Sequence, residues 1–176
     1  RFTYPWHFHS EYEIIYVEKG EGDCLVGDSI ISYSKGDLIL FGSELPHSMQ
    51  SPPDGGEESD NEEKTEPKVR GVNIQFEKDF MHYSISQYSQ FIPIRNLLED
   101  ACRGIKFTIT RSGKIIKLLE QIPSAKGADQ IILLLSLLQM MATSNHKKYL
   151  TTSHYTPSPS IMRNERMEKV IAYLNK

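Results

Sequence analysis

The sequence has 176 residues, 39% of them hydrophobic and 24% charged, which excludes a globally disordered chain and leaves room for one domain with or without a small appendage. The sequence has 20 Lys and Arg residues and 23 Asp and Glu residues, which gives a net charge of -3. This charge excludes an overall basic surface for binding nucleic acid. Two cysteines are too few for a disulfide framework, and we expect a reducing, cytoplasmic location.

Short strands separated by turns are predicted over the first half of the chain. The apolar segments behind this prediction are 13–17, 23–26, 29–33, 38–41 and 72–76. The segment 13–17 is apolar on both faces, so we expect it to be covered on both sides. Strands this short, with turns this frequent, indicate a closed antiparallel barrel or a sandwich.

An acidic segment interrupts these strands. Residues 51–68 contain seven acidic residues and two basic ones. Such a run of like charges cannot bury apolar surface. The sequence therefore predicts a mobile surface loop at 51–68.

Helices are predicted over the second half of the chain, and the longest covers 128–144. One apolar face of this helix is formed by Ile131, Leu134, Leu135, Leu138 and Met141. A second apolar face is formed by Leu133, Leu137 and Met140. A helix that is apolar nearly all round must be buried on two sides. We assign the first face to a dimer interface, with burial of both faces inside one chain as the open alternative. The run is too short to span a bilayer, which needs roughly 20 apolar residues.

The end of the sequence is predicted to be a linker followed by the start of another helix. Residues 155–160 are rich in Thr, Pro and Ser, and residues 165–175 restart a helical pattern. This last helix has too little around it to form a domain. We expect the chain to be a fragment whose final segment opens a domain that is not included.

Three histidines and one glutamate form the most specific chemical pattern in the sequence, namely His7, His9, Glu13 and His47. Residues 7 and 9 point to the same face of a strand, and a turn after them brings Glu13 onto the neighbouring strand. Three imidazoles and a carboxylate suit a divalent metal, with zinc as the first expectation and iron, manganese or nickel as alternatives. The other open interpretation is a pocket whose histidines hydrogen-bond within the barrel or contact an organic ligand without metal.

The spacing of His7, His9, Glu13 and Gly20 resembles the first motif of the cupin superfamily. The second cupin motif is met in part, by Gly36 and His47, with Gly42 where a proline is usual and Glu44 where a glycine is usual. Four longer sequence segments are similar to the sensor domain of AraC-type transcription regulators. They are Pro5-Trp6-His7-Phe8-His9, Glu11-Tyr12-Glu13-Ile14, Gly36-Asp37-Leu38-Ile39-Leu40-Phe41-Gly42 and Leu45-Pro46-His47. The segment 166–174 is similar to the opening helix of that family's DNA-binding domain, which holds two helix-turn-helix units.

The resemblance implies an α+β fold, mainly β in its first half, in which a cupin-like antiparallel β-barrel or jelly roll precedes a helical dimerisation segment. We predict the barrel over 1–83, the helical segment over 84–150, and over 151–176 a linker with the first helix of a missing DNA-binding domain.

The resemblance implies a cytoplasmic homodimer that is not an enzyme. It would bind a small metabolite, with a sugar among the candidates, or a metal in the barrel, and would reach DNA only through the missing domain. We expect no membrane partner. Two alternatives remain open: a metal-dependent cupin enzyme, such as a dioxygenase or sugar isomerase, and a sensor of the metal itself.

Overall fold

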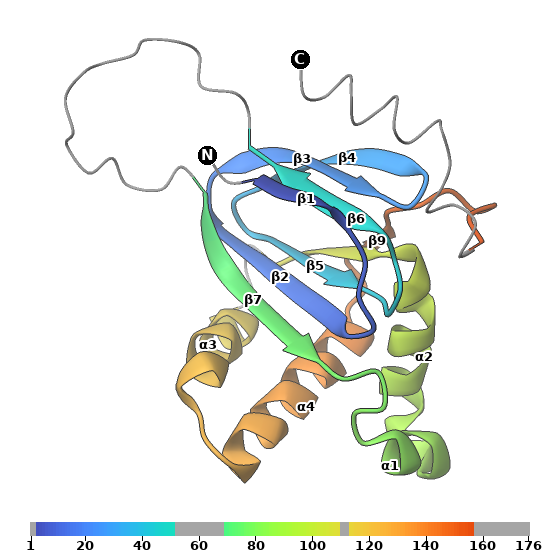
Figure 1. Ribbon diagram of the computed structural model, residues 1–176. Coiled ribbons are helices and arrows are strands. Elements are labelled where there is room, and N and C mark those ends of the chain that lie inside the picture. Colours follow the sequence, from blue (N-terminus) through green and yellow to red (C-terminus); the bar gives the residue numbers. More distant parts are fainter. Residues whose placement is uncertain (1–2, 52–68, 110–112, 157–176) are drawn as a thin grey trace, which may run out of the picture.

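Two antiparallel sheets lie face to face, and helices cover the outer face of one of them (Figure 1). The structure is a computed structural model, and it describes residues 3–51, 69–109 and 113–156. The four-stranded sheet has the order β1 (Thr3–His7), β6 (His47–Gln50), β3 (Glu21–Val26) and β4 (Ser29–Ser34). The five-stranded sheet has the order β7 (Arg70–Phe76), β2 (Tyr12–Lys19), β5 (Asp37–Phe41), β8 (Ile105–Thr108) and β9 (Lys147–Tyr149).

The helices are α1 (His82–Gln87), α2 (Ile92–Asp100), α3 (Gly113–Gln121) and α4 (Ala128–Ala142). Short 3-10 turns lie at Ser89–Phe91, Ala101–Arg103 and Ile122–Ser124. The predicted α+β fold, with strands dominating the first half, is confirmed. Within the described ranges, no helix is both long and apolar enough to cross a bilayer.

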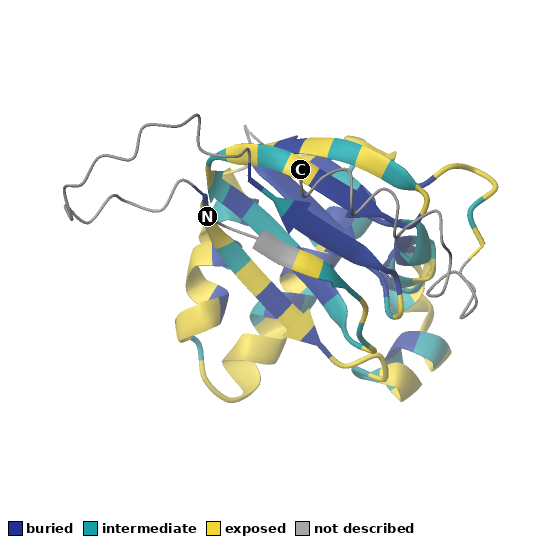
Figure 2. Cartoon of the chain, turned by 45° about the horizontal axis from the view of Figure 1, so that its top comes forward, coloured by how far each residue is buried: buried dark blue, intermediate teal, exposed yellow. Residues whose placement is uncertain are grey.

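The period of two along β2 divides the core into two layers. Val17 and its inward neighbours pack between the sheets, whereas Ile14 packs against the helices. Buried residues accordingly follow the strands, and the outer faces of the helices are exposed (Figure 2). The prediction that 13–17 is covered on both sides is confirmed.

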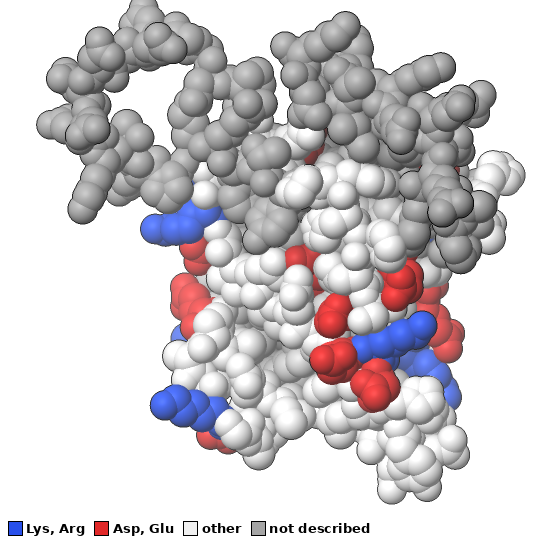
Figure 3. All heavy atoms as spheres, in the orientation of Figure 1, with Lys and Arg blue, Asp and Glu red and all other residues white. Residues whose placement is uncertain are grey.

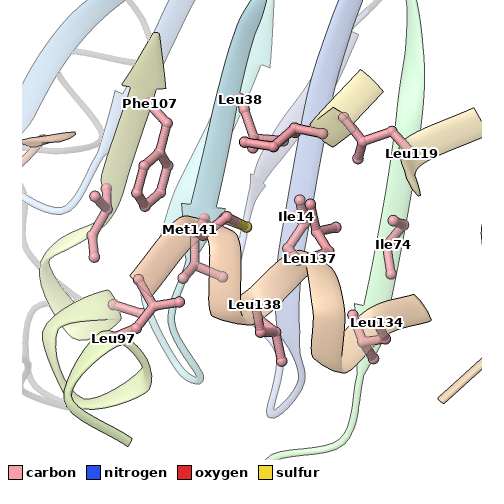
Figure 4. Packing of buried hydrophobic residues seen from close by; sticks show 14 of the residues in the cluster. Ile14, Leu38, Ile74, Leu97, Phe107, Leu119, Leu134, Leu137, Leu138 and Met141 are labelled. Carbon is pink, nitrogen blue, oxygen red and sulfur yellow. The ribbon is translucent and has the colours of Figure 1, made fainter. Parts of the chain in front are cut away.

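Most of the helix face assigned to a dimer interface is buried inside this chain. Leu134, Leu138 and Met141 are 7%, 0% and 0% exposed and belong to the core cluster beneath the five-stranded sheet (Figure 4). Assigning these three side chains to a partner subunit was wrong, because the sheet and neighbouring helices already cover them. Ile131, at 44% exposed, and the half-buried Leu135 keep accessible surface. Dimerisation itself stays a prediction.

Residue 83 does not mark the end of the sheet structure. The strands β8 and β9 come from the segment predicted as purely helical, yet β8 pairs with β5 and β9 pairs with β8. The barrel sheet and the helices that cover it are therefore built from interleaved parts of the chain. The predicted acidic loop lies outside the described residues except for Ser51, and so does 157–176 of the predicted linker and terminal helix.

The two cysteines are expected to differ strongly in reactivity. Cys24 is fully buried, and burial together with the charges of Glu13 and Asp23 raises the pKa of its thiol to about 12. Cys102 is partly exposed, although burial also raises its pKa. Because the thiolate is the reactive form, a disulfide reagent at pH 8 should modify Cys102 slowly and Cys24 only after unfolding. Mass spectrometry of the labelled native chain checks this, and fast labelling of Cys24 would contradict its burial.

Candidate metal and ligand site

The four predicted ligand residues lie together at one end of the space between the sheets. His7 ends β1 and faces His47, which begins β6, in the strand register. His9 follows β1, and Glu13 is the second residue of β2. One side-chain donor atom from each of the four lies within 4.8 Å of every other. The convergence predicted from the motif spacing is present.

The three imidazole rings are oriented in the same way. The Nδ1 atoms of His7, His9 and His47 each lie at hydrogen-bonding distance from a backbone carbonyl oxygen. The carbonyls belong to Pro5 at 2.7 Å, Glu11 at 3.1 Å and Leu45 at 2.8 Å. Because a carbonyl oxygen can only accept, each Nδ1 carries a proton, so Nε2 holds a lone pair in a neutral ring and a second proton, which it can donate, in a charged ring. Metal-binding histidines are commonly held by this arrangement.

A buried carboxylate accepts hydrogen bonds on both of its oxygens. Oε2 of Glu13 lies 2.7 Å from His47 Nε2 and 3.4 Å from His9 Nε2. Its Oε1 accepts hydrogen bonds from Asn73 Nδ2 at 2.6 Å and Gln75 Nε2 at 3.1 Å. Burial by itself raises the pKa of Glu13, which is 2% exposed, but the hydrogen bonds and the charge of His47 outweigh it and lower the pKa to about 2. Glu13 is therefore ionised at neutral pH.

A positive charge at the site, on a protonated His47 or on a bound cation, balances this carboxylate. A buried anion is costly unless it is paired. The described side chains that hydrogen-bond to Glu13 are two histidines and two amides, and none of them carries a permanent charge. A proton on one ring satisfies that ring alone, whereas a single divalent cation can satisfy three Nε2 lone pairs and the carboxylate together. The donor set thus fits a divalent metal ion.

Three neighbours of this site were missed by the sequence analysis. Asn73 and Gln75 hold one oxygen of Glu13, and the Phe41 ring stacks on His47 with a centroid distance of 4.2 Å and an interplanar angle of 7°. The strand register explains all three, since Phe41 and Gln75 pair with Glu13 on either side of it and Asn73 pairs with Ile15, two residues further along β2. The alternation of polar residues over 72–76 was the available signal. It was interpreted only as a half-buried strand.

A small cavity lies beside the site along β2 and β7. Its volume is about 140 Å³, and Asn73 lines it as well as holding Glu13. The remaining lining is mostly aliphatic, from Ile15, Val17, Met49, Val69 and Val72, with Arg70 as the charged member. A molecule in this cavity would meet apolar walls and reach the carboxylate through one amide.

The fold consists of two antiparallel sheets with a covering helical layer, and comparison with known proteins gives the following matches. Residues 1–60 match the family model of the AraC-like ligand binding domain. The predicted resemblance to the N-terminal domain of AraC-type regulators is thereby confirmed over this segment. No curated protein matches the chain significantly.

Solved structures of ToxT from Vibrio cholerae have a similar fold. A point variant in its apo form gives a TM-score of 0.51 at 15% identity, with 98% of this chain and 60% of that chain covered. Wild-type ToxT with a bound unsaturated fatty acid gives 0.51 at 16% identity, with 99% and 65% covered. A third ToxT structure gives 0.50 at 11% identity, with 96% and 61% covered. The chain thus spans less than two thirds of the ToxT chain, and the likeness concerns the fold alone.

Proposed function

We propose that this chain is the ligand-sensing half of an AraC-type transcription regulator that acts as a dimer and binds DNA through a domain outside this sequence. The family match over residues 1–60 and the shared fold with ToxT support this proposal. The observation that carries it is the polar site at one end of an otherwise apolar space between two sheets. A metal-dependent cupin enzyme would use the same four donors, but the matched family is a ligand-binding domain.

The proposal includes a divalent metal ion held by His7, His9, Glu13 and His47, with zinc first and iron, manganese or nickel as alternatives. The support is the shared orientation of the three rings and the ionised, buried Glu13. A bound metal ion would supply a Lewis acid to which an oxygen or nitrogen atom of an effector can bind. Asn73 and Gln75 hold the carboxylate in place, and Phe41 fixes the plane of His47.

The residues that line the cavity next to Asn73 indicate the chemical class of effector that would fit there. Aliphatic walls with one amide, from Asn73, are complementary to a small molecule with an apolar body and one polar group, since the Arg70 guanidinium is already paired with Glu18 at 2.9 Å. This chemistry fits a sugar poorly, because a sugar needs hydrogen-bonding partners around its whole surface. The fatty acid bound to ToxT belongs to the favoured class.

The regulator assignment is tested with the full-length product that contains this chain. We expect it to select a DNA sequence from a random duplex pool, and removal of the metal to change its affinity for that sequence about fivefold or more, as coupled sites do. Fluorescence anisotropy measures the affinity for DNA. His47→Ala removes a proposed metal ligand, so the DNA affinity of this variant should not respond to metal, and Lys117→Gln on α3 is the matched surface control. A product that selects no DNA would overturn the regulator assignment. An affinity indifferent to metal would overturn sensing through this site.

A further inference from the structure

A second pocket lies on the opposite face of the five-stranded sheet from Glu13. It has a volume of about 470 Å³ and is enclosed by the start of β2, the turn that follows β7, and the helices α1 and α2. Tyr12 forms one wall, stacked on Phe76 with a centroid distance of 5.3 Å. Successive residues of a strand point to opposite faces, so Tyr12 and Glu13 serve different pockets. This pocket is independent of the metal site.

The pocket combines an apolar floor with charges of both signs. Its apolar lining comes from Tyr12, Phe80, Ile85 and Leu98. Its charged lining comes from Lys78, Asp79, Arg95 and Glu99. Figure 3 shows that acidic and basic side chains lie side by side on the face of the molecule seen in Figure 1. Apolar surface with a few charges is the usual composition of a site for a small molecule.

Arg95 and Glu99 both line the pocket without pairing with each other. They are one turn apart on α2, a spacing at which opposite charges commonly pair. Both side chains lie in the described structure, and they form no ion pair there with each other or with Lys78 and Asp79. Arg95 instead donates from Nη1 to the carbonyl oxygen of Ser86 at 2.8 Å. That bond orients a half-buried guanidinium and leaves its other N–H groups available.

From this arrangement we infer that the pocket between β2, α1 and α2 binds a small zwitterion with an apolar body, the chemistry of a hydrophobic amino acid. The carboxylate of the ligand binds Arg95, and its ammonium group binds Glu99. The side chain of the ligand packs on Tyr12, Ile85 and Leu98. A ligand carrying only one charge would form only one of the two charge-assisted contacts, with the half-buried Arg95 or with the exposed Glu99, so both charges are needed for full affinity.

Titration of the 176-residue chain with L-phenylalanine, followed by NMR chemical shifts, tests this inference. We expect saturable binding with a Kd of ~1 mM or tighter. Arg95→Gln and Glu99→Gln should each weaken it about tenfold or more, because each removes a charge-assisted contact. Lys117→Gln and Glu120→Gln on α3 are the charge-matched controls and should leave it unchanged. His47→Ala should also leave it unchanged, because the metal site faces the other side of the sheet.

Two single-charge probes complete the experiment. We expect 3-phenylpropionate and phenethylamine to bind at least about tenfold more weakly than L-phenylalanine. Equal binding of 3-phenylpropionate, with no effect of Glu99→Gln, would overturn the zwitterion in favour of a simple carboxylate. No saturable binding of L-phenylalanine or L-leucine would overturn the pocket as a site for this class. Melting curves of Arg95→Gln and Glu99→Gln show whether either variant has lost its fold, and Arg95→Lys then provides the milder test of the same contact.

Discussion

Replacing Leu138 by Ala is expected to lower the free energy of unfolding by about 3 kcal/mol. The Leu138 side chain is 0% exposed and lies in the core cluster between α4 and the five-stranded sheet (Figure 4). Its truncation removes buried apolar surface and leaves a cavity that the surrounding strands cannot fill. For a chain of this length the melting temperature should fall by roughly 6–12 °C, which thermal unfolding followed by circular dichroism measures.

The matched control for this substitution is Ile132→Ala on the same helix. Ile132 is 57% exposed, so the same kind of truncation should cost less than about 1 kcal/mol. If Leu138 lay in a subunit interface, its effect on the melting temperature would depend on protein concentration, because association stabilises the folded state by mass action. We expect no such dependence. A reversed order of the two variants, or a concentration-dependent loss for Leu138→Ala, would show that the opposite face of α4 packs on the sheet.

Removing metal with a chelator is expected to destabilise the chain, and Glu13→Gln should abolish most of that response. A ligand that binds only the folded state at ~1,000 times its Kd adds about 4 kcal/mol of stability. The amide of glutamine nearly matches the size of the carboxylate but cannot supply its charge, so metal affinity falls. Thermal unfolding with and without a chelator, on both proteins, gives the difference.

Glu120→Gln, on the exposed face of α3, is the control and should respond to chelator as the unmodified chain does. Without metal, Glu13→Gln removes a buried negative charge, so its metal-free stability should lie within about 2 kcal/mol of the parent's. The metal proposal would be contradicted if the chelator did not change the melting temperature of the unmodified chain. It would also be contradicted if the chelator lowered the melting temperature of Glu13→Gln as much as that of the unmodified chain.

The predicted strands were those in which hydrophobic pattern and turn residues agree. Residues 14–17 of β2 and 38–41 of β5 are continuously apolar, and the hairpin of β3 and β4 is marked by Gly27-Asp28. The strands at His47–Gln50, Ile105–Thr108 and Lys147–Tyr149 were missed, because segments of three or four residues show no clear periodicity and form strands only through their partners. Periodicity also could not orient α4, which is apolar nearly all round. Its buried face was therefore mistaken for a surface shared with a partner.

The site was predicted more completely than the fold around it. The four donor positions followed from motif spacing, and that spacing encodes one strand, a turn and a facing strand. Asn73 and Gln75 lie about sixty residues from Glu13 in sequence, so only the pairing of β7 with β2 brings them to it. The shared orientation of the three rings depends on backbone carbonyls, and no residue pattern records it.

Elemental analysis of the purified chain tests the central claim most directly. After growth with zinc, iron, manganese and nickel and exhaustive dialysis, we expect close to one divalent metal ion per chain. Little or none should remain in Glu13→Gln and His47→Ala, each shown to be folded by protection of Cys24 from labelling. Metal content far below one per chain in the unmodified protein, or the same content in both variants, would contradict the assignment of His7, His9, Glu13 and His47 as a metal site.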